Sequence, residues 1–365
     1  MNRKTSIRSA TFLVALAVLV LGVTFVANAQ GNLDAVSVAL KWLPQAQFAG
    51  YYVAADQGFY LEEGLSVTII PGGSGGDPQD LVAAGTAQFG VTWLGILLEA
   101  RDQGVPLVNI AQIFQSSGFR YITWADSGIA SPSDLRGRTI ETWYGGNEVP
   151  LLALLDKYGI DSSRDLTLQS QAFDMGAFLN RSVAASAAMS YNELDVVFES
   201  IVADSLGISL DGLLGLSASD YRAAEANAVP AEQLTIFDVN HENVAMLEDM
   251  IFTSQSFLNT EENRDVAARF VRASLRGWEY ARDHRSEAVD IVLAQDASGA
   301  MSPLHQTLML DEVIELIWGS GVPLGYLDPT SFQQTADIAL QFGVIGSPAS
   351  SAAYSHQIWE QATSP

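Results

Sequence analysis

The sequence predicts an α/β fold of two lobes with a ligand cleft between them. The chain has 365 residues, of which 48% are hydrophobic, so it is long enough and apolar enough to form two cores. Segments with the two-residue period of strands alternate with helical segments as far as residue 253. Such alternation is the pattern of an α/β protein, so two α/β lobes are expected.

The first strand introduces the pattern of the first lobe. Val36, Val38 and Leu40 alternate with small or polar residues, which predicts a half-buried strand, and Pro44 requires this strand to end before it. A short helix follows and stops near Gly58. Further strands are predicted at 65–70, 87–91, 106–114 and 119–124, and helices at 79–84 and 94–103.

The second lobe shows the same alternation, and a helical tail follows it. We assign residues 34–124 and 246–365 to the first lobe and 125–245 to the second, with two hinge crossings near Trp124 and 239–249. Strands are predicted at 138–142, 166–169, 184–190, 233–239 and 245–253, and helices at 149–158, 174–180 and 194–206. The tail helices must bury their apolar stripes, and we expect all of them on the first lobe: 261–282, 285–293, 304–319, 331–342 and 350–361.

The overall charge and composition exclude several kinds of partner and chemistry. The net charge of −24 argues against nucleic acid and anionic membrane surfaces as partners. The chain has no cysteine, which excludes disulfides, thiolate metal sites and thiol catalysis. The four histidines lack metal-ligand spacing, and neither a nucleophile elbow nor a zinc-protease motif occurs. We therefore predict no catalytic residue, no metal and no cofactor.

Residues 1–29 have the features of a secretory signal peptide. A basic start precedes a run of mostly Leu, Val and Ala at 11–26, and Ala27-Asn28-Ala29 forms a cleavage site. An uncleaved membrane anchor is the alternative, but the apolar run is short for a membrane span. Without a lipobox cysteine, the mature protein is expected in the periplasm or cell envelope.

Three clusters of aromatic and polar residues lie where predicted strands end, at 42–51, 143–148 and 191–193. Ligands of open α/β sheets bind outside the carboxyl ends of strands. Aromatic faces stack on planar rings, and amides and carboxylates satisfy the polar edges of a heterocycle. Ordinary packing explains any single one of these residues equally well, so the prediction depends on their recurrence. The candidate ligand-binding residues are Trp42, Gln45, Gln47, Phe48, Tyr51, Thr92, Trp93, Gln115, Trp143, Tyr144, Asn147, Glu148, Tyr191, Asn192 and Glu193.

Two local patterns have both a functional and a structural interpretation. Glu148 and Glu193 could form a carboxylate pair for acid–base catalysis, but ligand hydrogen bonding or helix capping is the favoured interpretation. The glycine-rich loop at 72–76 could hold an anion. It lacks the Gly-Lys-Ser/Thr of a nucleotide-binding loop, so a plain turn capped by Asp77 is favoured.

The segment at 41–65, K-W-L-P-Q-A-Q-F-A-G-Y-Y-V-A-A-D-Q-G-F-Y-L-E-E-G-L, resembles the opening of the NMT1/THI5-like solute-binding proteins of bacterial ABC importers. The similarity covers most of the chain and includes 81–85, 104–106, 190–193 and Gly277-Trp278. The resemblance implies a type II periplasmic-binding-protein fold and an ABC transporter permease as partner. We expect the protein itself to be a monomer.

The same resemblance distinguishes a carrier from an enzyme. The pyrimidine synthases of this family use a lysine and a histidine in the segment after the third strand, together with a cysteine-rich motif. The matching positions here are Thr92 and Ile96, and the chain has no cysteine. A carrier is therefore predicted, rather than a pyrimidine synthase-like enzyme.

The ligand prediction depends on the first loop. Members of the family bind thiamine pyrimidine precursors, riboflavin or sulfonates. Those that bind formylaminopyrimidine carry Asn and His where this chain has Gln45, Gln47 and Phe48. Abundant aromatic surface with amides suits the larger isoalloxazine ring, so riboflavin is the first choice, as a transported ligand and not a cofactor. A pyrimidine precursor, formylaminopyrimidine or hydroxymethylpyrimidine, is the alternative.

Overall fold

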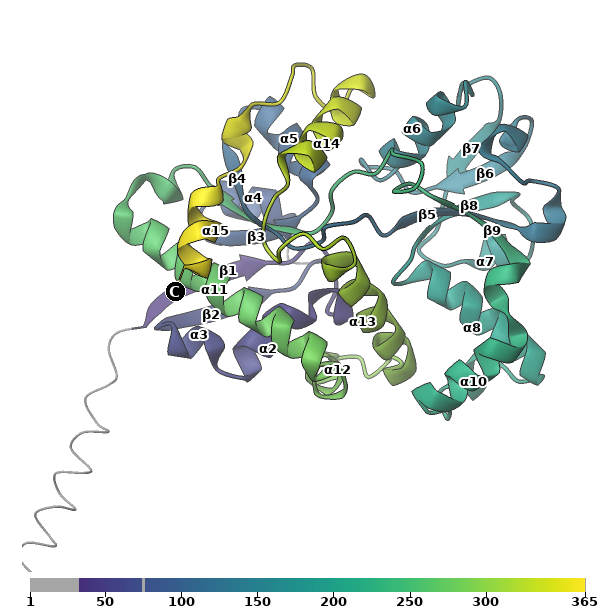
Figure 1. Cartoon of the computed structure of the whole chain (residues 1–365), viewed down its shortest axis with the longest axis horizontal. Helices are drawn as coiled ribbons and strands as arrows, with labels where there is room; N and C mark the ends of the chain where they lie inside the picture. The colour runs from purple at the N-terminus through teal and green to yellow at the C-terminus, as the bar shows by residue number, and fades with distance from the viewer. Residues whose placement is uncertain (1–32, 74–75, 365) are drawn as a thin grey trace, which may run out of the picture.

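A computed structural model describes residues 33–73 and 76–364, which form two lobes side by side (Figure 1). The predicted signal peptide at 1–29 lies outside the described residues, as do residues 74–75 of the glycine-rich loop. Each lobe is built on a five-stranded sheet, as the sequence predicts for two α/β lobes. Among the described residues, no helix combines the length and the apolar character needed to cross a bilayer.

The sheet of the first lobe is mostly parallel. Its strand order is β2 (Leu65–Ile70), β1 (Asp34–Ala39), β3 (Phe89–Thr92), β10 (Met250–Ser254) and β4 (Leu107–Gln112). β1 pairs in parallel with β2 and β3, and its register places Asp34 opposite Leu65. β10 runs antiparallel to both β3 and β4. Every residue of β4 is buried, which is typical of a strand covered on both faces.

The sheet of the second lobe repeats this plan. Its order is β7 (Thr167–Ser170), β6 (Thr139–Thr142), β8 (Ala185–Met189), β5 (Phe119–Trp124) and β9 (Leu234–Asp238). β6 is parallel to β7 and β8, and β5 is antiparallel to β8 and β9. In each sheet the antiparallel strand is the one that arrives from the other lobe. The chain therefore crosses between the lobes on the side of each sheet where the parallel strands end.

The boundary between the lobes differs from the sequence prediction at one strand. The sequence assigns 119–124 to the first lobe, but β5 belongs to the second sheet, where it pairs with β8 and β9. The first crossing is therefore 113–118 and does not lie near Trp124. An apolar pattern predicts that a strand forms, but strand pairing depends on contacts far along the chain. The second crossing, 239–249, connects β9 to β10.

Helices cover both sheets (Figure 1). Those of the first lobe are α2 (Ala49–Asp56), α3 (Phe59–Glu62), α4 (Pro78–Ala83), α5 (Leu94–Asp102), α11 (Glu261–Asp283), α12 (Arg285–Leu293), α14 (Pro329–Gln341) and α15 (His356–Thr363). Those of the second lobe are α6 (Val149–Lys157), α7 (Gly176–Leu179), α8 (Glu193–Leu206), α9 (Leu210–Leu213) and α10 (Ala218–Ala228). α2 packs closely on α11, since a Cβ added to Gly277 would lie 2.0 Å from the carbonyl oxygen of Gly50.

Two tail helices, α13 (Pro303–Trp318) and α14, contact both lobes, where the sequence predicts contact with the first alone. Gln341 of α14 donates a hydrogen bond to Asp156 of α6 at 2.8 Å. Leu304 and Leu308 pack into a cluster with Val202 of α8 and Tyr221 of α10. On the first lobe, Gln306 accepts a hydrogen bond from the backbone of Ala46 at 2.7 Å. α13 is apolar on more than one face, and this allows it to bridge the lobes.

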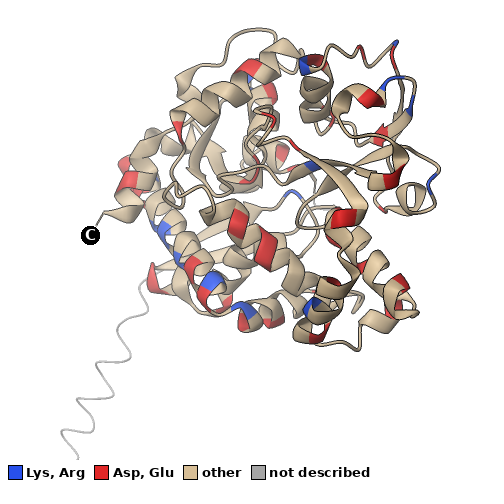
Figure 2. Ribbon diagram, turned by 45° about the vertical axis from the view of Figure 1, so that its right-hand side comes forward, with Lys and Arg blue, Asp and Glu red and all other residues tan. Residues whose placement is uncertain are grey.

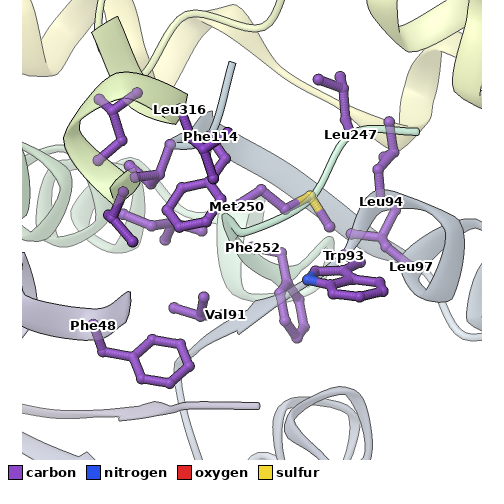
Figure 3. Close-up of a cluster of buried hydrophobic side chains, with 14 of the residues drawn as sticks. Phe48, Val91, Trp93, Leu94, Leu97, Phe114, Leu247, Met250, Phe252 and Leu316 are labelled. Carbon is purple, nitrogen blue, oxygen red and sulfur yellow. The ribbon is translucent and has the colours of Figure 1, made fainter. Parts of the chain in front are cut away.

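The core of the first lobe continues beneath the carboxyl ends of its strands. Figure 3 shows Phe48, Val91 and Phe252 in this core, with Trp93 beside them. The first three side chains are fully buried, whereas Trp93 is 9% exposed. Acidic residues are spread over both lobes and outnumber the basic ones (Figure 2), in keeping with the net charge of −24.

Candidate functional site

A cleft of ≈ 260 Å³ lies between the lobes, at the ends of the parallel strands of both sheets. Loops after β1 and β3 supply its first-lobe side, and loops after β6, β7 and β8 supply its second-lobe side. Its lining residues are Lys41, Trp42, Gln45, Gln47, Trp93, Ile96, Trp143, Asn147, Phe173, Met189, Tyr191, Asn192 and Glu193. Strand ends from two separate sheets thus converge on one space, as is usual for ligand sites in α/β proteins.

The cleft brings together most of the candidate residues that the sequence predicts. They are Trp42, Gln45, Gln47, Trp93, Trp143, Asn147, Tyr191, Asn192 and Glu193. The sequence analysis missed Lys41, Ile96, Phe173 and Met189 as lining residues. Lys41 lies inside the segment 41–65 that carries the family resemblance and could have been included among the candidates, whereas Phe173 has no distinctive sequence context.

Three other candidates are buried in the first-lobe core and do not line the cleft. Phe48 and Thr92 are 0% and 1% exposed. Tyr51 is 1% exposed and packs edge-on against Trp278, with ring centroids 5.9 Å apart. The 3₁₀ turn η1 (Ala46–Phe48) and α2 begin directly after the loop and turn these side chains inward. These three side chains therefore contribute to core packing, which is the alternative interpretation given for each candidate above.

Gln115, Tyr144 and Glu148 also lie outside the cleft lining. The Gln115 amide donates to the backbone carbonyls of Gln112 at 2.8 Å and Tyr326 at 2.9 Å. The Glu148 carboxylate accepts from the backbone of Gly146 at 2.9 Å, just before α6. Tyr144 is 48% exposed. These contacts hold loops in place, so the proposed carboxylate pair of Glu148 and Glu193 does not meet in the cleft.

The floor of the first-lobe side is organised by Asp249, a buried residue of the second crossing. Its carboxylate accepts one hydrogen bond from Nε1 of Trp93 and one from Nε2 of Gln47, both at 2.9 Å. Gln47 in turn accepts from Nε2 of Gln45 at 2.6 Å. Asp249 therefore orients three cleft residues at once. The only sequence signal for it is the acidic pair that directly precedes β10.

Lys41 lies above this floor, with its Nζ 3.2 Å from the centroid of the Trp93 ring. Burial lowers the pKa of Lys41 to about 8, although the nearby carboxylates of Asp249 and Glu248 oppose this shift. Burial likewise raises the pKa of Glu248 to about 7. One face of Trp93 is therefore occupied by a cation, so Trp93 cannot offer that face to a ligand.

Glu248 joins the two crossings to each other beneath the cleft. Its carboxylate accepts hydrogen bonds from the hydroxyl of Ser117 and from the backbone of Gly118 at 3.1 Å. Asn240 adds a second link, because it both accepts from and donates to the backbone of Ser117, at 2.9 and 2.8 Å. The hinge region is thus held by buried polar contacts, directly beside Lys41 and Asp249.

The second-lobe rim is organised around Glu193, which caps its own loop. Its carboxylate accepts from the backbone of Met189 at 3.0 Å and from Nδ2 of Asn192 at 2.7 Å. Burial raises the pKa of Glu193. The side-chain amide oxygen Oδ1 of Asn192 pairs with Nε2 of His305 at 2.9 Å, and Nδ1 of His305 pairs with the Glu199 carboxylate at 3.0 Å. His305 of α13 therefore connects the tail to the rim of the cleft.

The arrangement is suited to holding a flat polar molecule, and it offers little for bond-making chemistry. Thr92 is buried, and Ile96 contributes an apolar side chain to the cleft. Within residues 33–73 and 76–364, no three acidic or histidine side chains are grouped as metal ligands would be. The cleft instead combines aromatic rings, amides, one ammonium and one carboxylate, which is typical of a ligand-binding site.

Comparisons with known proteins agree with this description. The family model described as NMT1/THI5 like matches residues 45–288. The chain is 27% identical over 330 residues to the riboflavin-binding protein RibY of Chloroflexus aurantiacus, covering 88% of this chain and 84% of that protein. It is 25% identical over 329 residues to the formylaminopyrimidine-binding protein of Halalkalibacterium halodurans, covering 87% and 90%.

Solved structures with the same fold include the periplasmic aliphatic sulphonate binding protein SsuA from Escherichia coli. It matches with a TM-score of 0.58 and 15% identity, covering 87% of this chain and 90% of that one. The predicted periplasmic-binding-protein fold, with two α/β lobes around a cleft, is thereby confirmed.

Proposed function

This chain belongs to the NMT1/THI5-like family, and from that premise we propose that it is the substrate-binding component of an ABC importer that captures riboflavin. The observation that carries the proposal is the composition of the cleft. Rings from both lobes surround a space of ≈ 260 Å³, and amide side chains from both lobes line the same space. An isoalloxazine ring is apolar on its faces and polar on its rim, so it needs both kinds of group.

The roles of the cleft residues in this proposal follow from their exposure. Trp42 is 36% exposed and lines the cleft, where its ring would contact the ligand, whereas Trp143 and Tyr191 are 7% and 3% exposed and form the wall behind. Gln45 and Asn147 carry amides at the edge of the cleft, where they would hold carbonyl and ring-nitrogen groups or the ribityl chain.

A pyrimidine precursor is the second candidate ligand, and the size of the cleft favours it. Ligand pockets for larger molecules usually measure about 300–1,000 Å³. The cleft of ≈ 260 Å³ therefore accommodates one small ring fully, and a tricyclic ring only with its side chain directed through the open mouth. One relative of similar identity carries the name of a formylaminopyrimidine-binding protein.

The family also contains synthases, and the residues here support a carrier instead. Thr92 and Ile96 stand where those enzymes are expected to carry lysine and histidine, and neither can transfer a proton at neutral pH. We propose further that the protein is a monomer of the periplasm or cell envelope and that it delivers its ligand to a permease.

A fluorescence titration of riboflavin tests the proposal. Tryptophan or tyrosine in contact with an excited flavin donates an electron to it, so binding should quench riboflavin emission at micromolar concentration. The Trp42→Ala variant should bind more weakly by about 1–3 kcal/mol, the usual contribution of one aromatic stack. The matched control is Trp124→Phe, because Trp124 stacks on Phe178 at the end of β5 away from the cleft.

The possible outcomes distinguish the two ligands. Absence of quenching, together with heat released on adding formylaminopyrimidine, would show that the pyrimidine is the ligand. If Trp42→Ala binds riboflavin as tightly as Trp124→Phe does, the ring does not stack where we place it. Recovery of a chemically altered ligand after incubation with the protein would instead indicate an enzyme.

A further inference from the structure

We propose that Trp42 and Phe173 form an aromatic gate across the mouth of the cleft, and that Phe173 is a ligand-contacting residue that slows escape of the ligand. The inference rests on the proposed function, because it requires a ring-shaped ligand in this cleft. It adds a residue that the sequence analysis did not single out and assigns to it a kinetic role.

The gate joins the two lobes from opposite sides. Trp42 lies in the loop after β1 of the first lobe, and Phe173 lies in the loop after β7 of the second. Their ring centroids are 5.1 Å apart and their planes are inclined by 49°. Both side chains line the cleft. The two rings therefore meet in front of the space that a ligand would occupy.

The exposure of these rings distinguishes the mouth of the cleft from its floor. Phe173 is 75% exposed and Trp42 is 36% exposed. A second aromatic contact, between Phe114 of the first crossing and Tyr191 of the second lobe, has centroids 5.9 Å apart, and its members are 0% and 3% exposed. The floor pair is also confined, because a Cβ on Gly118 would lie 2.7 Å from the Tyr191 ring. Opening of the lobes would therefore separate the mouth pair more than the floor pair.

The backbones that carry the gate are held in place, although the rings are exposed. The carbonyl oxygen of Trp42 accepts from the backbone of Gly72 at 2.8 Å, and a Cβ on Gly72 would lie 2.5 Å from the backbone nitrogen of Trp42. On the other lobe, the carbonyl oxygen of Ala172 accepts from Nε1 of Trp143 at 3.2 Å. Asp174, on the other side of Phe173, accepts from the backbone of Gly176 at 2.8 Å. An exposed apolar ring on such an anchored loop is positioned to contact the facing ring or a ligand.

The spacing of the rings shows how the gate would work. A planar ligand held between two rings needs them about 7 Å apart, twice the van der Waals separation of about 3.5 Å. At 5.1 Å the two rings touch each other and leave no room for a ligand ring between them. The gate is therefore closed in this structure. A ligand must part Trp42 and Phe173 on entry and again on exit, and while bound it lies beneath them.

This arrangement predicts a kinetic signature. Removal of the Phe173 ring should speed both association and dissociation, because the barrier to passage is lowered in both directions. Dissociation should accelerate more than association, because the bound ligand also loses an apolar contact. A residue with a purely structural role would lower stability or the fraction of active protein, without changing the two rate constants in this pattern.

The test is stopped-flow fluorescence with riboflavin and the mature protein. Riboflavin released by rapid dilution regains its emission, so the dissociation rate constant is read directly. Phe173→Ala should raise it at least about fivefold, as expected for loss of one aromatic contact. Phe173→Tyr keeps the ring and should release riboflavin within about twofold of the wild-type rate. The control Leu61→Ala truncates an exposed side chain on α3 and should also stay within about twofold of that rate.

The outcomes separate failure of the gate from failure of the proposed function. If wild type binds riboflavin and Phe173→Ala releases it at the wild-type rate, the gate is refuted and the binding function stands. If wild type binds only formylaminopyrimidine, the same release experiment is followed by tryptophan emission, with the same expectation for Phe173→Ala. If wild type binds neither heterocycle, the proposed function and the gate are both wrong.

Discussion

Replacement of Asp249 by asparagine should disturb both the stability of the protein and its ligand cleft. The Asp249 carboxylate accepts from Trp93 and Gln47, both at 2.9 Å, and it faces the ammonium of Lys41. The asparagine side chain would keep one acceptor oxygen and turn a donor toward the other partner. Gln47 cannot simply rotate its amide, because its oxygen already accepts from Gln45 at 2.6 Å.

The size of the effect can be worked out from these contacts. A buried donor left without an acceptor costs about 1–3 kcal/mol. Removing one partner of a fully buried ion pair costs about 3–5 kcal/mol. That figure is an upper bound here, because Asp249 and Lys41 interact as neighbouring charges without direct ion-pair contact, and Glu248 remains beside Lys41 as a second acidic group. We therefore expect Asp249→Asn to lower the free energy of unfolding by about 2–3 kcal/mol.

Urea unfolding followed by tryptophan emission measures this loss, and riboflavin titration of the folded variant measures the effect on the cleft. Asp265→Asn is the matched control: it makes the same chemical change at a carboxylate that is 54% exposed and pairs with Arg269. An exposed ion pair contributes about 0–1 kcal/mol, so the control should remain close to wild type.

The reasoning would be refuted if Asp249→Asn lost no more stability than Asp265→Asn. If the variant were destabilised but bound riboflavin as tightly as wild type, Asp249 would support the fold without orienting the ligand site. In that case Gln45 would not hold the ligand in the way proposed.

Three further expectations concern other parts of the site and fold. Burial raises the pKa of Glu248 from 4.5 to about 7, so the folded protein binds this proton more tightly than the unfolded chain does. The stability contributed by the bound proton is therefore lost as the pH rises from 4.5 to about 7. Glu248→Gln should therefore show a smaller fall in melting temperature from pH 5 to pH 7.5 than wild type. Gly277→Ala would place a Cβ 2.0 Å from the Gly50 carbonyl oxygen, and urea unfolding should show a loss of more than about 2 kcal/mol. His305→Ala removes the hydrogen bond that holds Asn192, and riboflavin affinity measured by titration should weaken by about 1 kcal/mol.

Each of these expectations has a control and a contrary result. Glu62→Gln changes an exposed carboxylate and should keep the wild-type pH dependence; if Glu248→Gln also keeps it, the raised pKa is wrong. Gly95→Ala places its Cβ 2.9 Å from the flexible end of Met246 and should be tolerated, so equal losses at Gly95 and Gly277 would contradict the packing argument. His241, 88% exposed, provides the histidine control. Equal binding by His241→Ala and His305→Ala would show that α13 does not position Asn192.

The sequence predicts local structure well where short-range physics decides it. The alternation at Val36, Val38 and Leu40 predicts β1, and the helical spacing after residue 260 predicts the long helix α11. Such patterns depend on residues only a few positions apart. The prediction went wrong where the partner of an element mattered. β5 joined the second sheet and α13 bridged both lobes, because each element buries surface against residues far away in the chain.

The same distinction holds for the cleft. The sequence by itself determined that aromatic and amide side chains follow several strands, because the residue types and strand ends are local features. Only the tertiary structure decided which of them face the cleft: Tyr51 packs on Trp278, whereas Trp42 remains exposed. It also brought Gln47 to Asp249, 202 positions away. Contacts between such distant residues depend on how the two lobes are joined, and no local pattern in the chain encodes that.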